Sequence, residues 1–229
     1  MTAASPSAAG WGRSAAAATT TLLLRHGQTE LSSERRFAGR GDIPLAKEGL
    51  AQARMVARRL AGCDARAVVC SPLARARRTA EAVAEATGAP LVVDNDLAEA
   101  DFGQWEGLTF AEAEQGWPEE LAAWLASPDA APPGGETFAA VALRVLGALD
   151  RMLGAYRQQT VVVVSHVTPI KTILCRALLA PPVTMFRINL DVASLSHADF
   201  FDDGNAVVRS LNDTAHLRTR RRAWSRQGA

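Results

Sequence analysis

The sequence predicts an α/β fold whose sheet is mainly parallel. Three short apolar runs, at 21–24, 67–70 and 161–164, have the length and continuity of strands that are buried on both faces. A loop or the start of a helix follows each run at once, as in the strand-helix units of parallel sheets. Because ligands bind at the carboxyl ends of the strands in open α/β sheets, the residues directly after these runs are candidate site residues.

Length and charge limit the classes of protein to consider. The chain has 229 residues, of which 48% are hydrophobic, and a formal net charge of +1. This length favours one folded domain over 21–213, with a disordered leader or linker at 1–20 and a basic flexible tail at 214–229. The near-neutral charge gives no general attraction for nucleic acid or for anionic membranes, so an anion site requires a local group of arginines.

The cysteines and the first twenty residues bear on location. Cys63, Cys70 and Cys175 are odd in number and widely spaced, which favours reduced thiols in a cytoplasmic protein over a disulfide or zinc framework. No apolar run is long enough to span a membrane. The Ala/Ser/Thr-rich stretch 1–20 lacks the continuous apolar core of a signal peptide, and it suits a linker to a tethered domain as well as a simple tail.

The first apolar run ends at Arg25, His26 and Gly27. His26 is therefore expected at the mouth of the sheet. The polar, glycine-dotted stretch 31–44 is predicted to be a loop over the same edge. Apolar residues at three- and four-residue spacing then predict an amphipathic helix over about 47–61.

The second run is followed by Ser71 and Pro72, which we interpret as the N-cap and first residue of a helix. Arg75 would then lie near the amino end of that helix. Helix amino ends favour anions, and a guanidinium group can bind two phosphate oxygens at once.

The third run, Val161 to Val164, ends at Ser165 and His166, with Thr168 and Pro169 as another cap and first-turn pair. Each of the three runs thus leads to His or Arg at the same edge of the sheet. A phosphate or other oxyanion site at this edge is the expected consequence.

Glu99 follows a short predicted strand at 91–93 and can reach the same edge. A phosphate dianion nearby, or burial, favours a protonated carboxyl, so Glu99 is a candidate proton donor. The alternative is that Glu99, Asp101 and Glu106 form a solvated acidic loop.

The remaining elements are a lid, a long helix and a hairpin. The stretch 109–135 carries tryptophans and prolines, and is either a lid of short helices or a surface excursion. Helical spacing of apolar residues predicts a helix over 136–157 that packs on the sheet. The segments 193–200 and 206–211 flank a turn at 202–205 and predict a hairpin.

These residues together suggest phosphoryl transfer. A neutral imidazole can attack phosphorus and form a phosphohistidine, so His26 is the expected nucleophile. Arg25, Arg75 and His166, with backbone amides at the helix starts, would stabilise the transferred group. Glu99 would protonate the departing alkoxide and later accept a proton from the attacking water, without a metal.

Four motifs carry a resemblance to a known family. They are RHGQT at 25–29, SPLARARRT at 71–79, EADFGQWEG at 99–107 and SH at 165–166. In this order they resemble the histidine phosphatase superfamily, also called phosphoglycerate mutase-like, over about 21–211. The resemblance implies a three-layer α/β/α sandwich, with helices on both faces of a mostly parallel sheet, and neither metal nor other cofactor.

The resemblance also implies roles for individual residues. His26 would be the phosphorylated histidine and Glu99 the acid. The phosphoryl group would be held by Arg25, Ser32, Arg75, His166 and Val167. Many relatives have Asn at the position of Ser32, whose shorter hydroxyl would reach phosphate through water. Relatives often cap the next helix with Thr where this chain has Ala46, a difference of about 1 kcal/mol.

Within the family, EADFGQWEG and the short excursion to PPGGETF at 132–138 resemble the phosphatase branch, which includes acid phosphatases and α-ribazole phosphatases. The motifs resemble more specifically the phosphatase half of actinobacterial proteins that join ribonuclease H to an acid phosphatase. The implied function is metal-independent hydrolysis of a small phosphorylated metabolite. The leader would then belong to a linker.

Three other functions are alternatives to a phosphatase. A cofactor-dependent phosphoglycerate mutase would transfer phosphate to an acceptor rather than to water. A phospho-ligand binding module would have lost catalysis. A zinc hydrolase is disfavoured because His197 and His216 lack ligand-like spacing. No nucleic-acid or membrane partner is expected for this chain, and the sequence leaves a homodimer open.

Overall fold

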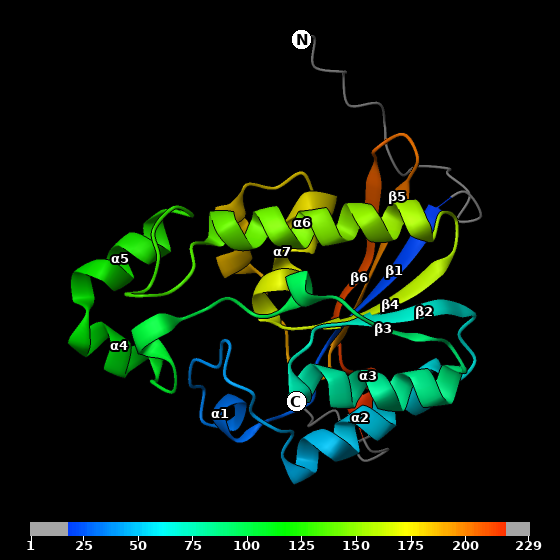
Figure 1. The fold of residues 1–229 in the computed structure, drawn as a ribbon, viewed down its shortest axis with the longest axis horizontal. Coiled ribbons are helices and arrows are strands. Elements are labelled where there is room, and N and C mark those ends of the chain that lie inside the picture. Colours follow the sequence, from blue (N-terminus) through cyan, green and yellow to red (C-terminus); the bar gives the residue numbers. More distant parts are fainter. Residues whose placement is uncertain (1–17, 219–229) are drawn as a thin grey trace, which may run out of the picture.

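The computed structural model describes residues 18–218, and within them a six-stranded sheet lies between two helical layers (Figure 1). The strand order is β3-β2-β4-β1-β5-β6. The strands are β1 (Ala18–Arg25), β2 (Ala65–Cys70), β3 (Leu91–Val93), β4 (Thr160–Ser165), β5 (Leu195–Phe201) and β6 (Ala206–Asp213). The first four in this order run parallel, and the antiparallel hairpin β5-β6 pairs with β1. The predicted fold class is confirmed.

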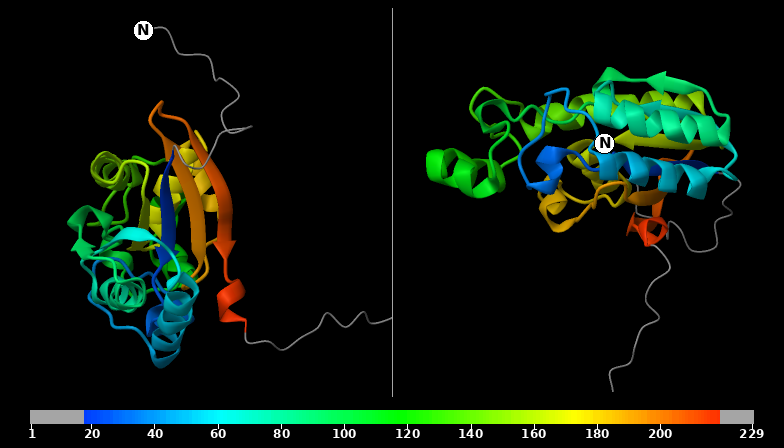
Figure 2. Two further views of the ribbon diagram at one scale, coloured as in Figure 1. Left: turned by 90° about the vertical axis from the view of Figure 1, so that its right-hand side faces the viewer. Right: turned by 90° about the horizontal axis from the view of Figure 1, so that it is seen from below.

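Two helices cover each face of the sheet (Figures 1 and 2). One layer is α2 (Lys47–Leu60) and α3 (Ala74–Thr87), and the other is α6 (Phe138–Ala155) and α7 (Val167–Ala177). Successive residues of a strand point to opposite faces. Val162 accordingly packs in the core under α2 and α3, and Val163 packs in the core under α6 and α7. This double burial explains why the strand is a continuous apolar run.

The central strand β1 begins at Ala18, so residues 18–20, assigned to the leader from the sequence, belong to the sheet. Thr20 lies between Thr160 of β4 and Asp199 of β5, and its hydroxyl donates to the Asp199 carboxylate at 2.8 Å. Threonine is β-branched and fits a strand once its hydroxyl has a partner. The rest of the predicted leader, and the tail from 219 onward, lie outside the described residues.

A lid of two short helices, α4 (Phe110–Gly116) and α5 (Pro118–Ala126), extends beyond the end of the sheet in Figure 1 and in the right-hand view of Figure 2. Its inner side is aromatic, because Trp124 contacts the rings of Phe37, Phe102 and Phe138. The prediction of short helices between 109 and 135 is thus confirmed.

The stretch 31–44 was expected to be a loop throughout, but its first residues belong to a one-turn helix, α1 (Glu30–Ser33). Thr29 and Ser32 form a reciprocal capping box at its start. Four short 3-10 helices complete the described chain: η2 (Asn95–Leu97), η3 (Gly103–Trp105), η4 (Pro182–Arg187) and η5 (Ala215–Leu217). No helix within 18–218 is long and apolar enough to cross a membrane.

Two helix starts differ from the sequence prediction. Helix α3 begins at Ala74, three residues after Ser71, and has no side-chain cap. The Ser71 hydroxyl instead lies 2.7 Å from Nε2 of His166, so a tertiary contact replaces the predicted cap. Helix α7 begins at Val167 with His166 as its N-cap residue, which places Thr168 and Pro169 inside the first turn.

Candidate active site

The predicted site residues meet at the carboxyl ends of the parallel strands. Arg25 ends β1 and His26 follows it, while His166 follows β4. The rings of His26 and His166 lie with their centroids 5.0 Å apart. Next to them is a cavity of about 800 Å³, whose walls include Arg25, His26, Ser32, Glu99 and Val167.

His26 is buried and its ring orientation is fixed by the backbone. Its Nδ1 lies 2.7 Å from the carbonyl oxygen of Gly27. A carbonyl only accepts, so Nδ1 must carry the proton and Nε2 keeps the free lone pair. Gly27 packs tightly on α2, because a Cβ there would lie 2.5 Å from the carbonyl oxygen of Gly49. Glycine is therefore required for this orientation of the loop.

Burial sets the charge of the two histidines. It lowers the pKa of His26 well below the usual range, and the positive charges of Arg25 and Arg75 lower it further. Burial also lowers the pKa of His166 well below the usual range. Both imidazoles are neutral at neutral pH, and neutral Nε2 of His26 is a competent nucleophile.

Arg75 is fully buried in the first turn of α3 and is held by a loop. Its Nη1 donates to the carbonyl oxygen of Gly41 at 2.8 Å, and its Nη2 donates to those of Gly39 at 2.7 Å and Ala38 at 3.0 Å. These three bonds fix the guanidinium plane. Burial lowers the pKa of Arg75, although a guanidinium remains charged in proteins.

Three buried side-chain nitrogens near His26 have no hydrogen-bond partner among the described residues. They are Nε of Arg25, Nε of Arg75 and Nδ1 of His166. The Ser71 hydroxyl accepts from the amide of Leu73, and when it donates to Nε2 of His166 the proton of that ring is on Nδ1. Buried donors without a partner are costly, so their gathering here indicates a site built for an oxyanion.

Glu99 is buried, which contradicts the alternative of a solvated acidic loop. Its carboxylate accepts from the amides of Val167 at 3.0 Å and Thr168 at 3.2 Å, at the amino end of α7. The Val167 amide, predicted to bind phosphate, is thus engaged with Glu99 in this structure. The neighbouring acids have structural contacts: Asp101 accepts from Gly103, and Glu106 accepts from Gly39 and Arg40.

Ser32 lines the cavity, but its hydroxyl is occupied. It accepts from the Thr29 amide at 2.8 Å and donates to the Thr29 carbonyl oxygen at 2.9 Å. Donation to a phosphate would cost the hydroxyl its bond to that carbonyl. The contact of Ser32 with phosphate through water stays a prediction.

The sequence prediction missed Lys171 and an apolar wall. Lys171 lies one turn after Val167 on α7 and lines the cavity, and burial lowers its pKa. Its four-residue spacing from Val167 is the signal that could have found it. The apolar wall combines side chains of the lid and η4 with others from the loops around them and from the start of α6: Phe37, Phe102, Phe110, Trp124, Leu125, Phe138, Met185, Phe186 and Leu190.

The two histidines of the zinc alternative lie outside the cavity. His197 contacts Asp199 within β5, and His216 contacts the carbonyl oxygen of Ala193. Within residues 18–218, no group of three or more His, Cys, Asp or Glu side chains is arranged to hold a metal ion.

A buried neutral histidine, the guanidinium groups of buried Arg75 and half-buried Arg25, and a carboxylate at the end of a parallel sheet match a known protein class. A family model of the histidine phosphatase superfamily (branch 1) covers residues 21–214, and the chain belongs to this superfamily. Within it, the chain is 49% identical over 214 residues to the bifunctional protein Rv2228c of Mycobacterium tuberculosis. This confirms the resemblance seen in the four motifs.

Two further relatives bear names of activities. The chain is 33% identical to phosphoserine phosphatase 1 of Hydrogenobacter thermophilus, covering 86% of this chain and 93% of that protein. The α-ribazole phosphatase of Shigella flexneri has a similar structure, with a TM-score of 0.76, 28% identity, and coverage of 85% of this chain and 96% of that one. The match with Rv2228c covers 93% of this chain but 59% of the longer mycobacterial protein.

Proposed function

We propose that this chain is a metal-independent phosphomonoesterase that hydrolyses a small phosphorylated metabolite through a phosphohistidine on His26. The observation that carries the proposal is the position of neutral His26 beside three buried side-chain nitrogens, those of Arg25, Arg75 and His166, that lack partners. A phosphoryl group would supply oxygens for these donors beside a nucleophilic nitrogen. The names of the phosphatase relatives support the same reaction class.

In the first half of the proposed reaction, Nε2 of His26 attacks phosphorus and the bond to the leaving oxygen breaks. Arg25, Arg75 and His166 stabilise the charge on the transferred group. Glu99 donates its proton to the departing oxygen, so that an alcohol leaves rather than an alkoxide. The products of this half are the alcohol, phosphohistidine and the Glu99 carboxylate.

In the second half, the Glu99 carboxylate accepts a proton from a water molecule that attacks phosphorus. The bond between phosphorus and Nε2 of His26 breaks, and inorganic phosphate leaves. His26 returns to its neutral form and Glu99 to its protonated form. The Nδ1 bond to Gly27 holds the His26 ring throughout, so the same nitrogen receives and releases the phosphoryl group.

The side chains that line the cavity indicate which kind of substrate would fit it. Beyond His26 its wall is mainly aromatic and aliphatic, with Phe110 and Phe186 each more than two-fifths exposed. We therefore expect the alcohol part of the substrate to present apolar surface toward the lid. Lys171 has no ion-pair or hydrogen-bond partner among the described residues, and is placed to contact a polar group between that surface and the phosphate.

We also propose that the protein is cytoplasmic and that a further domain is tethered to this chain. Cys63, Cys70 and Cys175 are all free thiols, which supports a cytoplasmic protein. The greater length of Rv2228c supports a tethered domain beyond this chain.

The first test compares the wild type with His26→Ala on p-nitrophenyl phosphate in the presence of EDTA. We expect the wild type to release p-nitrophenol and inorganic phosphate in equal amounts, and the variant to lose at least about 10³-fold in kcat. His197→Ala, whose ring lies outside the cavity, is the matched control and should keep its activity.

Three results would contradict the proposal: activity that EDTA removes, activity that survives in His26→Ala, or phosphate that passes to an added phosphoglycerate instead of to water. Because a phosphorus–nitrogen bond is labile in acid and stable in base, denaturing the wild type in alkaline detergent during turnover should trap phosphate on the protein, and the trapped phosphate should be absent from His26→Ala. A thermal melt of each variant establishes that the fold is intact.

A further inference from the structure

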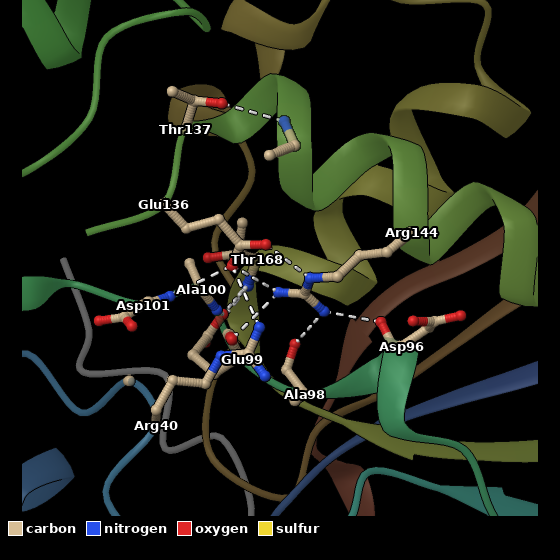
Figure 3. Close-up of polar contacts among 12 residues, drawn as sticks. Arg40, Asp96, Ala98, Glu99, Ala100, Asp101, Glu136, Thr137, Arg144 and Thr168 are labelled. Atoms are coloured by element: carbon tan, nitrogen blue, oxygen red, sulfur yellow. Dashed lines mark hydrogen bonds and ion pairs between the residues drawn. The ribbon is translucent and has the colours of Figure 1, made fainter. Parts of the chain in front are cut away.

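The segment that carries Glu99 is contacted by one arginine, Arg144 (Figure 3). Arg144 lies on α6, and its Nη1 donates to the carbonyl oxygens of Asp96 at 2.7 Å and Ala98 at 2.6 Å. Its Nη2 donates to the carbonyl oxygen of Glu99 itself at 3.1 Å. A single side chain thus satisfies three backbone carbonyls on the approach to the candidate acid.

Glu136 completes this arrangement from the other side of the guanidinium. It accepts from Nε of Arg144 at 2.8 Å and from Nη2 at 2.9 Å, in a two-pronged ion pair. The Glu136 carboxylate also accepts from the amide of Asp101 at 3.3 Å. The pair therefore contacts the chain on both sides of Glu99, as Figure 3 shows.

The Glu99 segment depends on such contacts because it belongs to no helix or strand. Residues 98–102 lie between η2 and η3 and have no sheet partner. Arg144 and Glu136 are mostly buried, with side-chain exposures of 15% and 17%, so their ion pair is weakly screened by water. A planar guanidinium offers five donors in a fixed geometry, which a lysine cannot reproduce.

We propose that Arg144, held by Glu136, is a positioning residue that sets the Glu99 carboxyl group for proton donation to the leaving oxygen. The inference rests on the proposed phosphatase function. Arg144 does not line the cavity, so it acts through the Glu99 segment and not on the substrate. Geometry errors of about 1 Å at a catalytic group reduce rates by about 10².

The test uses the dependence of the rate on the leaving group. Phenyl phosphate needs protonation of its leaving oxygen, whereas p-nitrophenyl phosphate has a similar ring and a far better leaving group. For Arg144→Gln we expect kcat/KM to fall roughly 10²-fold on phenyl phosphate and much less on p-nitrophenyl phosphate. This parameter covers only the steps up to the first irreversible one, taken here as departure of the alcohol, so the later water attack does not enter it.

The matched control is Arg151→Gln. Arg151 lies two turns further along α6 and binds the side chains of Asp94 and Asp96 at the surface, rather than the backbone of the Glu99 segment. The Arg151→Gln change should leave the ratio of kcat/KM on phenyl phosphate to kcat/KM on p-nitrophenyl phosphate unchanged. Arg144→Lys should recover little of the loss, because the ammonium cannot replace five bonds.

A second pair of variants keeps the proposal testable if Arg144→Gln folds poorly. Glu136→Gln preserves shape and weakens the ion pair, and it should shift the substrate ratio in the same direction. In addition, Glu99→Gln combined with Arg144→Gln should be no slower on phenyl phosphate than Glu99→Gln alone, since Arg144 acts through Glu99. The ratio of two substrates is insensitive to the fraction of protein that is folded.

Equal losses on the two substrates, or losses of Arg144→Gln and Glu99→Gln that simply multiply, would overturn the positioning role. These results are distinct from failure of the proposed function, in which the wild type hydrolyses neither substrate or His26→Ala remains active.

Discussion

Two neutral imidazoles buried side by side make the folded state sensitive to acid. The pKa values of His26 and His166 lie well below the value of about 6.5 expected in the unfolded chain. Below that pH the unfolded chain binds protons that the folded chain does not. We predict a free energy of unfolding that is constant above about pH 7 and falls below about pH 6.5, by about 1.4 kcal/mol per pH unit for each histidine. Urea unfolding between about pH 5 and 8 measures this slope.

The control for this prediction is His26→Gln, which removes one of the two buried imidazoles. Below about pH 6.5, the free energy of unfolding of this variant should fall less steeply than that of the wild type, by about 1.4 kcal/mol per pH unit. Acidic groups with a lowered pKa, such as Glu136 and Asp199, lose their contribution only below their ordinary values near 4, outside this window. Identical slopes for the two proteins would refute the assignment.

At the residue scale, the sequence predicts side chains whose place follows from the backbone. His26 and His166 come directly after buried strands, so both are expected at the same edge of the sheet, and the structure adds that their strands β1 and β4 are neighbours. Lys171 could have been found from its helical spacing. Arg144 could not, because its contacts with the Glu99 segment depend on how α6 crosses the sheet, and no local pattern encodes that crossing.

At the scale of the element, α2 begins without a side-chain cap. Ala46 has extended backbone angles at the N-cap position and no hydroxyl to accept a free amide. We predict that Ala46→Thr raises the free energy of unfolding by about 1 kcal/mol. Ala46→Val has nearly the same shape without the hydroxyl, and it should give no such gain. Urea midpoints of the three proteins decide the matter, and equal values for the Thr and Val variants would show that the cap is not formed.

Most elements could be predicted from periodicity, because apolar spacing records which face is buried. The start of α3 could not. Ser71 and Pro72 are a strong local signal, yet the Ser71 hydroxyl bonds the amide of Leu73, before the helix starts, and His166, which follows a strand far along the chain. Ser32 shows a local effect instead, since its hydroxyl forms a capping box with Thr29, three residues earlier.

At the scale of the whole molecule, both cores and all the candidate catalytic residues lie within 18–218. A chain trimmed to 18–218 should therefore keep the urea midpoint and kcat/KM of the full chain. Further removal of 18–20 should destabilise it by about 2 kcal/mol, because the Thr19 hydroxyl accepts from Gln158 and the Thr20 hydroxyl donates to Asp199. Equal midpoints for the two trimmed chains would place the domain boundary at 21 after all.

The fold class could be predicted from the order of strands and helices, but the arrangement of strands in the sheet could not. Parallel pairing joins segments that share no local signal, and β1 lies between β4 and β5 rather than beside β2. The apolar wall was missed for a similar reason, since it combines side chains from the lid and from η4.

The position of β1 has a consequence for biosynthesis. Residue Thr20 pairs with Thr160, 140 positions later (160 − 20), so the first strand made waits for partners from the second half of the chain. At roughly 5–20 residues per second, this wait lasts about 7 to 28 seconds. During that time an apolar strand on the nascent chain has no sheet to join. Its exposure makes β1 a natural target for chaperones that bind at the ribosome exit.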